Sequence, residues 1–260
     1  MTTDNSEFRG RPLAGTLAVA EDRTHTAALL TARGVLDSRT YLQLRDSIVQ
    51  AALARPRAVL VDVDNLEVPA PSAWSVFSSA QWLVATWPAV PIRLVCARQQ
   101  QRTAATRAGV ARQVPLHRTV QGALDALPES VCAQACARVA LPAALASLRA
   151  AREFVAHSLS AWAMDDLVPV ATVVVNVFVE NVLQHTVAAP VLILETDGTT
   201  VTVAVQDDCT QYAMRHEDPI RSGERISGLA IVASVSRAWG ATPTGQGKAV
   251  WAVIGPENRL

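Results

Sequence analysis

The sequence has 260 residues, of which 50% are hydrophobic and 18% are charged, and its 23 basic and 23 acidic side chains balance. This length suits two ordinary domains, and the hydrophobic share is large enough for packed cores. The balanced charge argues against a broad nucleic-acid-binding surface, which needs a clustered basic excess, and no helix-turn-helix pattern or Lys/Arg-rich run supports one. We therefore expect no nucleic-acid partner.

No segment predicts secretion or a membrane span. Residues 1–10 are polar and carry both charge signs, unlike the apolar part of a signal peptide. The longest apolar run, 168–175, is interrupted by Pro169 and Thr172 and is too short to cross a bilayer. We therefore expect a cytoplasmic protein with no membrane partner.

The cysteines are predicted to be reduced thiols, because the sequence gives no secretory context for disulfides. They are Cys96, Cys132, Cys136 and Cys209. Cys132 and Cys136 lie four residues apart, but no histidine or second cysteine pair completes a zinc site. We expect no structural metal.

The first half alternates short apolar runs with stretches of helical periodicity, which predicts a mixed α/β sheet with some parallel strands. The expected strands are 26–32, 58–63, 91–96 and 114–117. The expected helices are 38–52, with Ser38 as N-cap, followed by 71–88, 98–109 and 120–127. Because 58–63 is almost continuously apolar, we expect that strand to be covered on both faces.

The pattern changes after 128–130. Two long amphipathic helices, a hairpin around Asp197-Gly198, a third helix and a last strand predict a two-layer α/β sandwich. The expected helices are 143–163, 167–185 and 229–239, and the expected strands are 191–195, 201–205 and 249–254. The long polar stretch 207–227 is typical of a mobile lid.

Ser72 is the candidate modification site of the first half. It follows an apolar strand, a loop and Pro71, so it is predicted to lie where a helix begins. Free amides and the helix dipole favour an anion there, so a phosphoryl group fits. The simpler alternative is that Ser72 only caps the helix. Ser75 and Ser78 are weaker alternatives because they lie further inside the helix.

The first half resembles the STAS domain of anti-sigma-factor antagonists, on Gly34-Val35-Leu36-Asp37, on 61–68 and on the serine helix. In that family a D-S-S-G stretch begins the helix, and its second serine accepts phosphate. The stretch falls on Ala70-Pro71-Ser72-Ala73, so the resemblance implies Ser72 as phosphoacceptor, with the other three positions changed.

The second half resembles the anti-sigma serine kinases of the GHKL (HATPase_c) class, first in the helical stretch 144–155. Their E-x-x-x-N-x-x-x-H helix falls on Val177, Asn181 and His185. The resemblance implies ATP, with Mg²⁺ held by Asn181, but Val177 replaces the general-base glutamate and cannot take a proton. Glu180 lies about 100° around the helix from Asn181 and is a poor substitute.

Three further sites carry this resemblance. Asp207 falls where the D-x-G aspartate accepts the adenine amino group, and Gly228 falls at a phosphate-binding helix start. Lys248 lies in a G-K-T-V-W-like closing strand. The resemblance thus implies ATP binding through Asn181, His185, Asp207, Gly228 and Lys248, whereas Cys209, Ile226 and Ala249 depart from the pattern.

The expected domains are a tail (1–14), a STAS-like domain (15–128), a linker with a first strand (129–140) and a GHKL kinase-like domain (141–260). The resemblances imply a regulator of sigma-factor activity that switches between partners: a sigma factor, an anti-sigma factor or a STAS-domain protein. Two alternatives stay open, an active protein-serine kinase that phosphorylates a STAS domain and an inactive nucleotide-sensing scaffold. A homodimer is also left open.

Overall fold

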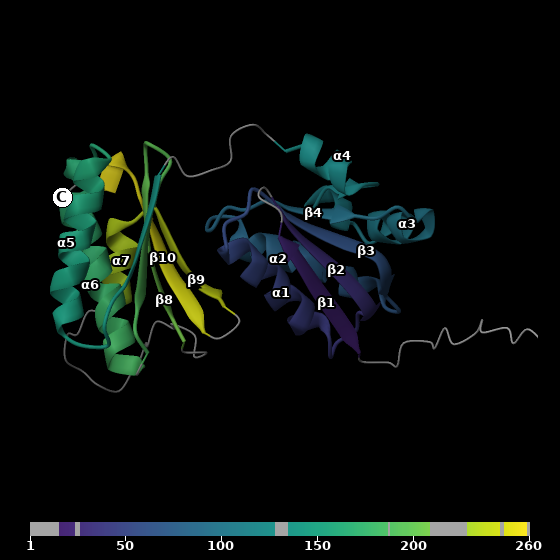
Figure 1. Cartoon of the computed structure of the whole chain (residues 1–260), viewed down its shortest axis with the longest axis horizontal. Helices are drawn as coiled ribbons and strands as arrows, with labels where there is room; N and C mark the ends of the chain where they lie inside the picture. The colour runs from purple at the N-terminus through teal and green to yellow at the C-terminus, as the bar shows by residue number, and fades with distance from the viewer. Residues whose placement is uncertain are drawn as a thin grey trace, which may run out of the picture. The chain divides into compact units, whose positions relative to one another are not determined.

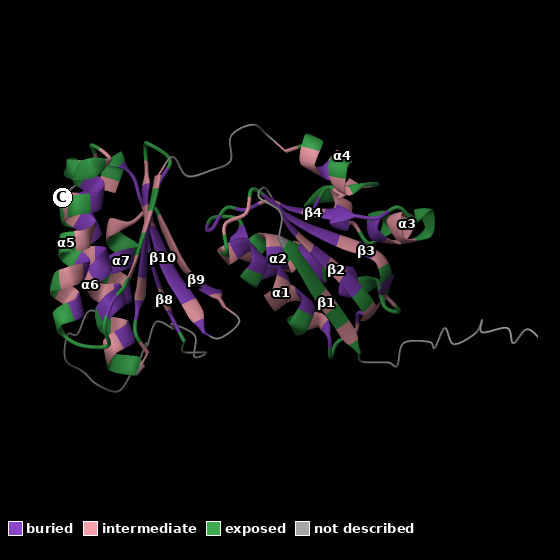
Figure 2. Ribbon diagram, viewed as in Figure 1, coloured by how far each residue is buried: buried purple, intermediate pink, exposed green. Residues whose placement is uncertain are grey.

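The computed structural model describes residues 16–23, 27–127, 135–186, 188–208, 228–244 and 247–258. The chain divides into two compact units, Met1–Glu129 (unit 1) and Ser130–Leu260 (unit 2) (Figure 1). Each unit is a mixed α/β structure with its own five-stranded sheet. Buried residues concentrate in the strands and along one side of each long helix (Figure 2).

The sheet of unit 1 has the order β1-β2-β3-β4-β5. Its strands are β1 (Leu17–Arg23), β2 (Ala28–Val35), β3 (Val59–Glu67), β4 (Ile92–Val95) and β5 (Leu116–His117). β1 pairs antiparallel with β2, and every other neighbouring pair is parallel. Helical crossovers therefore connect the parallel strands, as the alternating pattern predicts.

Helices cover both faces of this sheet. They are α1 (Tyr41–Leu53), α2 (Ser75–Val84), α3 (Gln99–Arg107) and α4 (Val120–Asp125), with short 3-10 turns η1 (Pro71–Trp74) and η2 (Val110–Arg112). Val59 and Val61 of β3 join the main core with α1 and α2, while Leu60 joins a second cluster with Ala123 of α4. The prediction of a strand covered on both faces is confirmed.

Two predicted helix starts are wrong in detail. Helix α1 begins at Tyr41, and its N-cap is Thr40 rather than Ser38. The turn before the helix is held by Asp37, whose Oδ1 accepts from the backbone N of Arg39 at 2.8 Å and of Thr40 at 3.2 Å. The helix predicted from Pro71 begins as the 3-10 turn η1 and becomes α-helical only at Ser75. Proline fits the first helical turn because its missing N–H is not needed there.

Unit 2 has an antiparallel sheet of order β6-β7-β8-β10-β9, with helices on one face (Figure 1). Its strands are β6 (Ala135–Ala140), β7 (Val191–Thr196), β8 (Val201–Asp207), β9 (Ala238–Pro243) and β10 (Lys248–Ile254). The helices are α5 (Ala146–Ala161), α6 (Val168–His185) and α7 (Gly228–Val235), with short turns η3 (Asp165–Leu167) and η4 (Pro256–Asn258).

The predicted hairpin is confirmed, with Gly198 at its turn in the left-handed region at φ +87°. The helix predicted over 229–239 is wrong at its end: α7 stops at Val235, and Trp239 lies in β9. Pairing of β9 with β10 overrides the apolar run that suggested a longer helix.

Helix α6 belongs to a segment, Asp165–His185, that is long and apolar enough to cross a membrane, with mean hydropathy 1.6. Half of its most apolar window is buried inside the protein, where Val174 and Phe178 pack in the core of unit 2. A helix that is apolar on most sides is typical of a buried position between other layers.

Candidate functional site

Ser72 is exposed at the second residue of η1. Trp74, two residues later, is only 1% exposed and packs in the core, with its ring centroid 5.7 Å from that of Phe77. The buried indole therefore anchors the turn while the serine hydroxyl stays accessible. Ser75 is also exposed, and its Oγ lies 3.3 Å from the hydroxyl of Tyr41 on α1.

The outer surface of α2 carries no charge. No Asp, Glu, Lys or Arg occurs from Pro71 to Val84, and Trp82 is 79% exposed on the side away from the buried Val76 and Ala80. Large exposed aromatic side chains are enriched where proteins bind one another. We call Ser72, Ser75 and Trp82 the α2 surface. Trp82 was missed at the sequence level, although the absence of charges over 71–84 was a visible signal.

The end of β3, which precedes Ser72 in the chain, is held by the start of α3. The Asp64 carboxylate accepts from the backbone N of Arg98 at 3.0 Å and from the thiol of Cys96 at 3.2 Å. Arg98 donates to Asn65 at 3.2 Å, and Gln101 donates to the carbonyl of Leu66. These contacts fix the end of β3, from which the chain continues to η1.

This cluster also sets the chemistry of Cys96. Burial, and then the hydrogen bond to Asp64, raise the pKa of the Cys96 thiol to about 12. Burial alone would raise the pKa of Asp64, but hydrogen bonds from the Arg98 amide and the Cys96 thiol lower it below its usual value. Cys96 is therefore a protonated structural thiol at neutral pH and not a nucleophile.

In unit 2, Val177 and Gly228 lie against each other where α6 meets α7. A Cβ placed on Gly228 would come within 2.9 Å of the Val177 Cγ1 atom. The missing side chain of Gly228 is therefore what lets Val177 fit. Asn181 and His185 follow Val177 at four-residue steps on α6, so the three share one helix side. Asn181 is half-buried and His185 is exposed.

Asp207 and Lys248 form an ion pair between β8 and β10. They are directly opposite in the strand register, and the Lys248 Nζ lies 3.1 Å from Oδ2 and 3.3 Å from Oδ1 of Asp207. The side chains are 3% and 12% exposed respectively. Lys248 is the only lysine among the 23 basic residues of the chain. The pairing was missed at the sequence level because 41 residues separate the partners.

Gly247 lets β10 approach β8 closely beside this pair. A Cβ on Gly247 would lie 2.0 Å from the backbone oxygen of Asp207, too close for any side chain. The chain therefore holds the start of β10 against the end of β8, and Lys248 is kept next to Asp207.

These residues do not fit ATP with Mg²⁺. Val177 cannot accept a proton, and its side chain packs against Gly228. Both oxygens of the Asp207 carboxylate already lie within hydrogen-bond distance of the Lys248 ammonium. Across the described ranges, no group of three or more His, Cys, Asp or Glu side chains is placed to hold a metal. Of the remaining predicted positions, Cys132, Cys209, Ile226 and most of the predicted lid lie outside the described residues.

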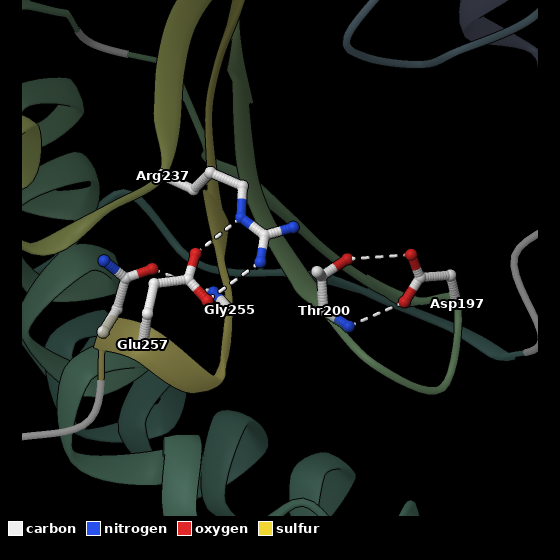
Figure 3. Close-up of polar contacts among 6 residues, drawn as sticks. Asp197, Thr200, Arg237, Gly255 and Glu257 are labelled. Carbon is white, nitrogen blue, oxygen red and sulfur yellow. Dashed lines mark hydrogen bonds and ion pairs between the residues drawn. The ribbon is translucent and has the colours of Figure 1, made fainter.

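The opposite end of the same sheet carries a second polar cluster (Figure 3). Arg237, between α7 and β9, donates to both oxygens of Glu257, with Nε–Oε1 at 2.5 Å and Nη2–Oε2 at 2.8 Å. The pair lies over Gly255, where a Cβ would come within 2.4 Å of Glu257. Nearby, Asp197 accepts from the backbone N of Thr200 at 2.6 Å. The cluster secures the end of β10 and has the character of a structural clasp.

The ion pair with Arg237 leads us to predict a lowered pKa for Glu257 that can be measured. The Arg237 guanidinium lowers the pKa of Glu257 to about 2. A carboxyl whose pKa is depressed on folding stabilises the fold above its unfolded pKa and loses that contribution as the pH falls toward 2. Arg237→Gln should raise the pKa of Glu257 from about 2 toward the value of an unpaired glutamate, about 4.3, because the Arg237 hydrogen bond is the largest cause of the shift. An NMR titration of the side-chain carboxyl carbon measures it.

Arg149→Gln is the matched control for this titration, because Arg149 pairs with Glu153 on the exposed side of α5. It should leave the Glu257 titration unchanged. A midpoint for Glu257 that stays near 2 in Arg237→Gln would contradict the assignment of the shift to this pair.

No protein-family model matches the chain, and no curated protein matches it. Solved structures do match. One is the crystal structure of an anti-sigma factor antagonist from Mycobacterium paratuberculosis, which is 15% identical, has a TM-score of 0.39, and covers 45% of this chain and 97% of that chain. Another is the anti-sigma factor antagonist SpoIIAA in its unphosphorylated form, which is 16% identical, has a TM-score of 0.36, and covers 44% of this chain and 99% of that chain.

Proposed function

We propose that this chain is a cytoplasmic regulator of sigma-factor activity that works by exchanging protein partners. Unit 1 is the STAS antagonist-like half, and unit 2 is a degenerate half that resembles an anti-sigma kinase. The α2 surface is the observation that carries the proposal: an accessible Ser72 begins an uncharged stretch that ends near a largely exposed Trp82. The partner is a sigma factor, an anti-sigma factor or another STAS-domain protein.

Phosphorylation of Ser72 is the proposed switch. A phosphoryl group adds about two negative charges, which is a large change for a surface that has none. A partner that covers Trp82 would then have to desolvate those charges, so its affinity would fall. The α3 contacts to Asn65 and Leu66 support the switch because they fix the end of β3, from which the chain continues to Ser72.

Unit 2 is proposed to contribute binding rather than catalysis. Val177 removes the proton acceptor that phosphoryl transfer to a serine uses, a loss of about 10²–10⁴-fold in rate. The phosphate on Ser72 therefore comes from another kinase. Fusion of the two units in one chain raises the effective concentration of each toward a shared partner.

The test is partner capture with the full chain, from the cells that produce it, identified by mass spectrometry. The unaltered chain should retain a sigma factor or a sigma regulator, and Ser72→Glu and Trp82→Ala should each reduce the amount at least about tenfold, equal to about 1.4 kcal/mol. Ser234→Glu is the control, because Ser234 is exposed on α7 of unit 2.

Two outcomes would overturn the proposal. One is repeated capture of neither a sigma factor nor a sigma regulator. The other is transfer of labelled phosphate from ATP to Ser72 by the purified chain with Mg²⁺, which would make the protein a kinase.

A further inference from the structure

The ion pair of Asp207 and Lys248 lies on the helix-covered side of the sheet of unit 2. Side chains alternate between the two faces of a strand. Val201, Val203 and Val205 of β8 pack in the core with α6, so Asp207 projects to that same side. Lys248 shares the face of Val250 and Ala252 in β10 by the same alternation. The pair therefore lies at one end of the packed layer between the sheet and the helices.

On this face, the Asp207 carboxylate has the chemistry to bind a ligand that carries an amino group. A carboxylate accepts hydrogen bonds from amines, amidines and the amino group of adenine. Here both of its oxygens already face the Lys248 ammonium, and the carboxylate is only 3% exposed. Hydrogen bonds between charged partners are about twice as strong as neutral ones. A neutral amino group would therefore have to displace a stronger bond.

We propose that the Lys248 ammonium, by binding the Asp207 carboxylate, keeps ligands that carry an amino group, adenine nucleotides among them, from binding unit 2. This inference rests on the proposed function, in which unit 2 binds partners and does not turn over ATP. Gly247 supports it, because the close approach to the Asp207 backbone leaves Lys248 little freedom to move away. The Lys248 side chain thus keeps unit 2 from binding a nucleotide.

The test is calorimetric titration of the full chain with ADP, without Mg²⁺. The unaltered protein should show no saturable binding up to about 1 mM, which corresponds to about −4.1 kcal/mol. Lys248→Met, which keeps the length of the side chain without its charge, should bind ADP at least tenfold more tightly. Lys248→Gln, whose amide still donates to Asp207, should lie between the two. Asp207→Asn added to Lys248→Met should remove the gained binding.

The unaltered protein offers a second measurement, because Lys248 is the chain's only lysine. Metabolic labelling with ¹³C-lysine gives one side-chain Cε signal, which ADP should leave unmoved. A saturable shift of that signal would overturn the proposal even if neither Lys248 variant folds.

Equal ADP affinity in the unaltered protein and in Lys248→Met would overturn the role of Lys248, as would absence of ADP binding by a folded Lys248→Met. Neither result affects partner exchange, which is decided by capture of a sigma factor or regulator. Failure of the inference and failure of the proposed function are therefore distinguishable.

Discussion

Lys248→Met should lower the free energy of unfolding of unit 2 by about 3–5 kcal/mol, because it leaves a buried carboxylate without its counter-charge. Asp207 is 3% exposed, so water cannot replace the ammonium at full strength. Hydrogen exchange read by mass spectrometry in increasing urea measures the effect peptide by peptide. The loss should appear in peptides of unit 2, whose core shares no residue with that of unit 1.

A double-mutant cycle separates the pair from its surroundings. Asp207→Leu combined with Lys248→Met should recover most of the loss, because apolar residues of similar volume often replace a buried ion pair without net cost. Arg149→Met is the matched control: its partner Glu153 is exposed, so the change should stay within about 0.5 kcal/mol. A loss below about 1 kcal/mol for Lys248→Met would mean that water reaches Asp207 in the folded chain.

The same variant connects stability with ligand binding. If ADP binds Lys248→Met, it should raise the free energy of unfolding of unit 2 by about 1.4 kcal/mol at an ADP concentration tenfold above its dissociation constant, and the urea midpoint should rise with it. The unaltered protein should show no such rise. The comparison detects ADP binding as a gain in the stability of unit 2, so no catalytic turnover is needed.

Local patterns predicted most of the elements of both units. The continuous apolar run of β3 indicated a strand covered on both faces, and Val61 and Leu60 do face different cores. The Asp197-Gly198 turn indicated the hairpin of β7 and β8, and the left-handed Gly198 shows why that dipeptide suits it. These signals are local, because period and turn chemistry are set by neighbouring residues.

Features made by distant residues could not be predicted in the same way. The apolar run predicts that Trp239 continues a helix, but pairing with β10 places it in a strand. The sequence showed that Val177 could not act as a base, but not that Gly228 leaves just enough room for it. Asp207 and Lys248 were each assigned to one site from the resemblance alone. Only the register of β8 with β10 shows that they neutralise each other.

Trp74→Ala should lower the free energy of unfolding of unit 1 by about 3–5 kcal/mol, the usual range for removing a buried large aromatic side chain. Trp74 is 1% exposed, and its loss leaves a cavity beside Phe77 that the surrounding strands and helices cannot fill. Hydrogen exchange should quicken in peptides of α2 and β3 and stay unchanged in unit 2. Because Trp74 anchors η1, partner capture through Ser72 should weaken at the same time.

Trp82→Ala is the control that separates loss of the Trp74 anchor in the core from loss of a side chain that contacts the partner. Trp82 lies two helical turns further along α2 and is 79% exposed, so its removal should change the stability of unit 1 by no more than about 0.5 kcal/mol. Partner capture should still fall, because in the proposed function the Trp82 side chain contacts the partner rather than the core. If Trp74→Ala destabilised both units equally, the two cores would unfold as one cooperative unit. If both tryptophan variants lost stability alike, the exposed indole would be part of the fold and the α2 surface would lose its role in binding.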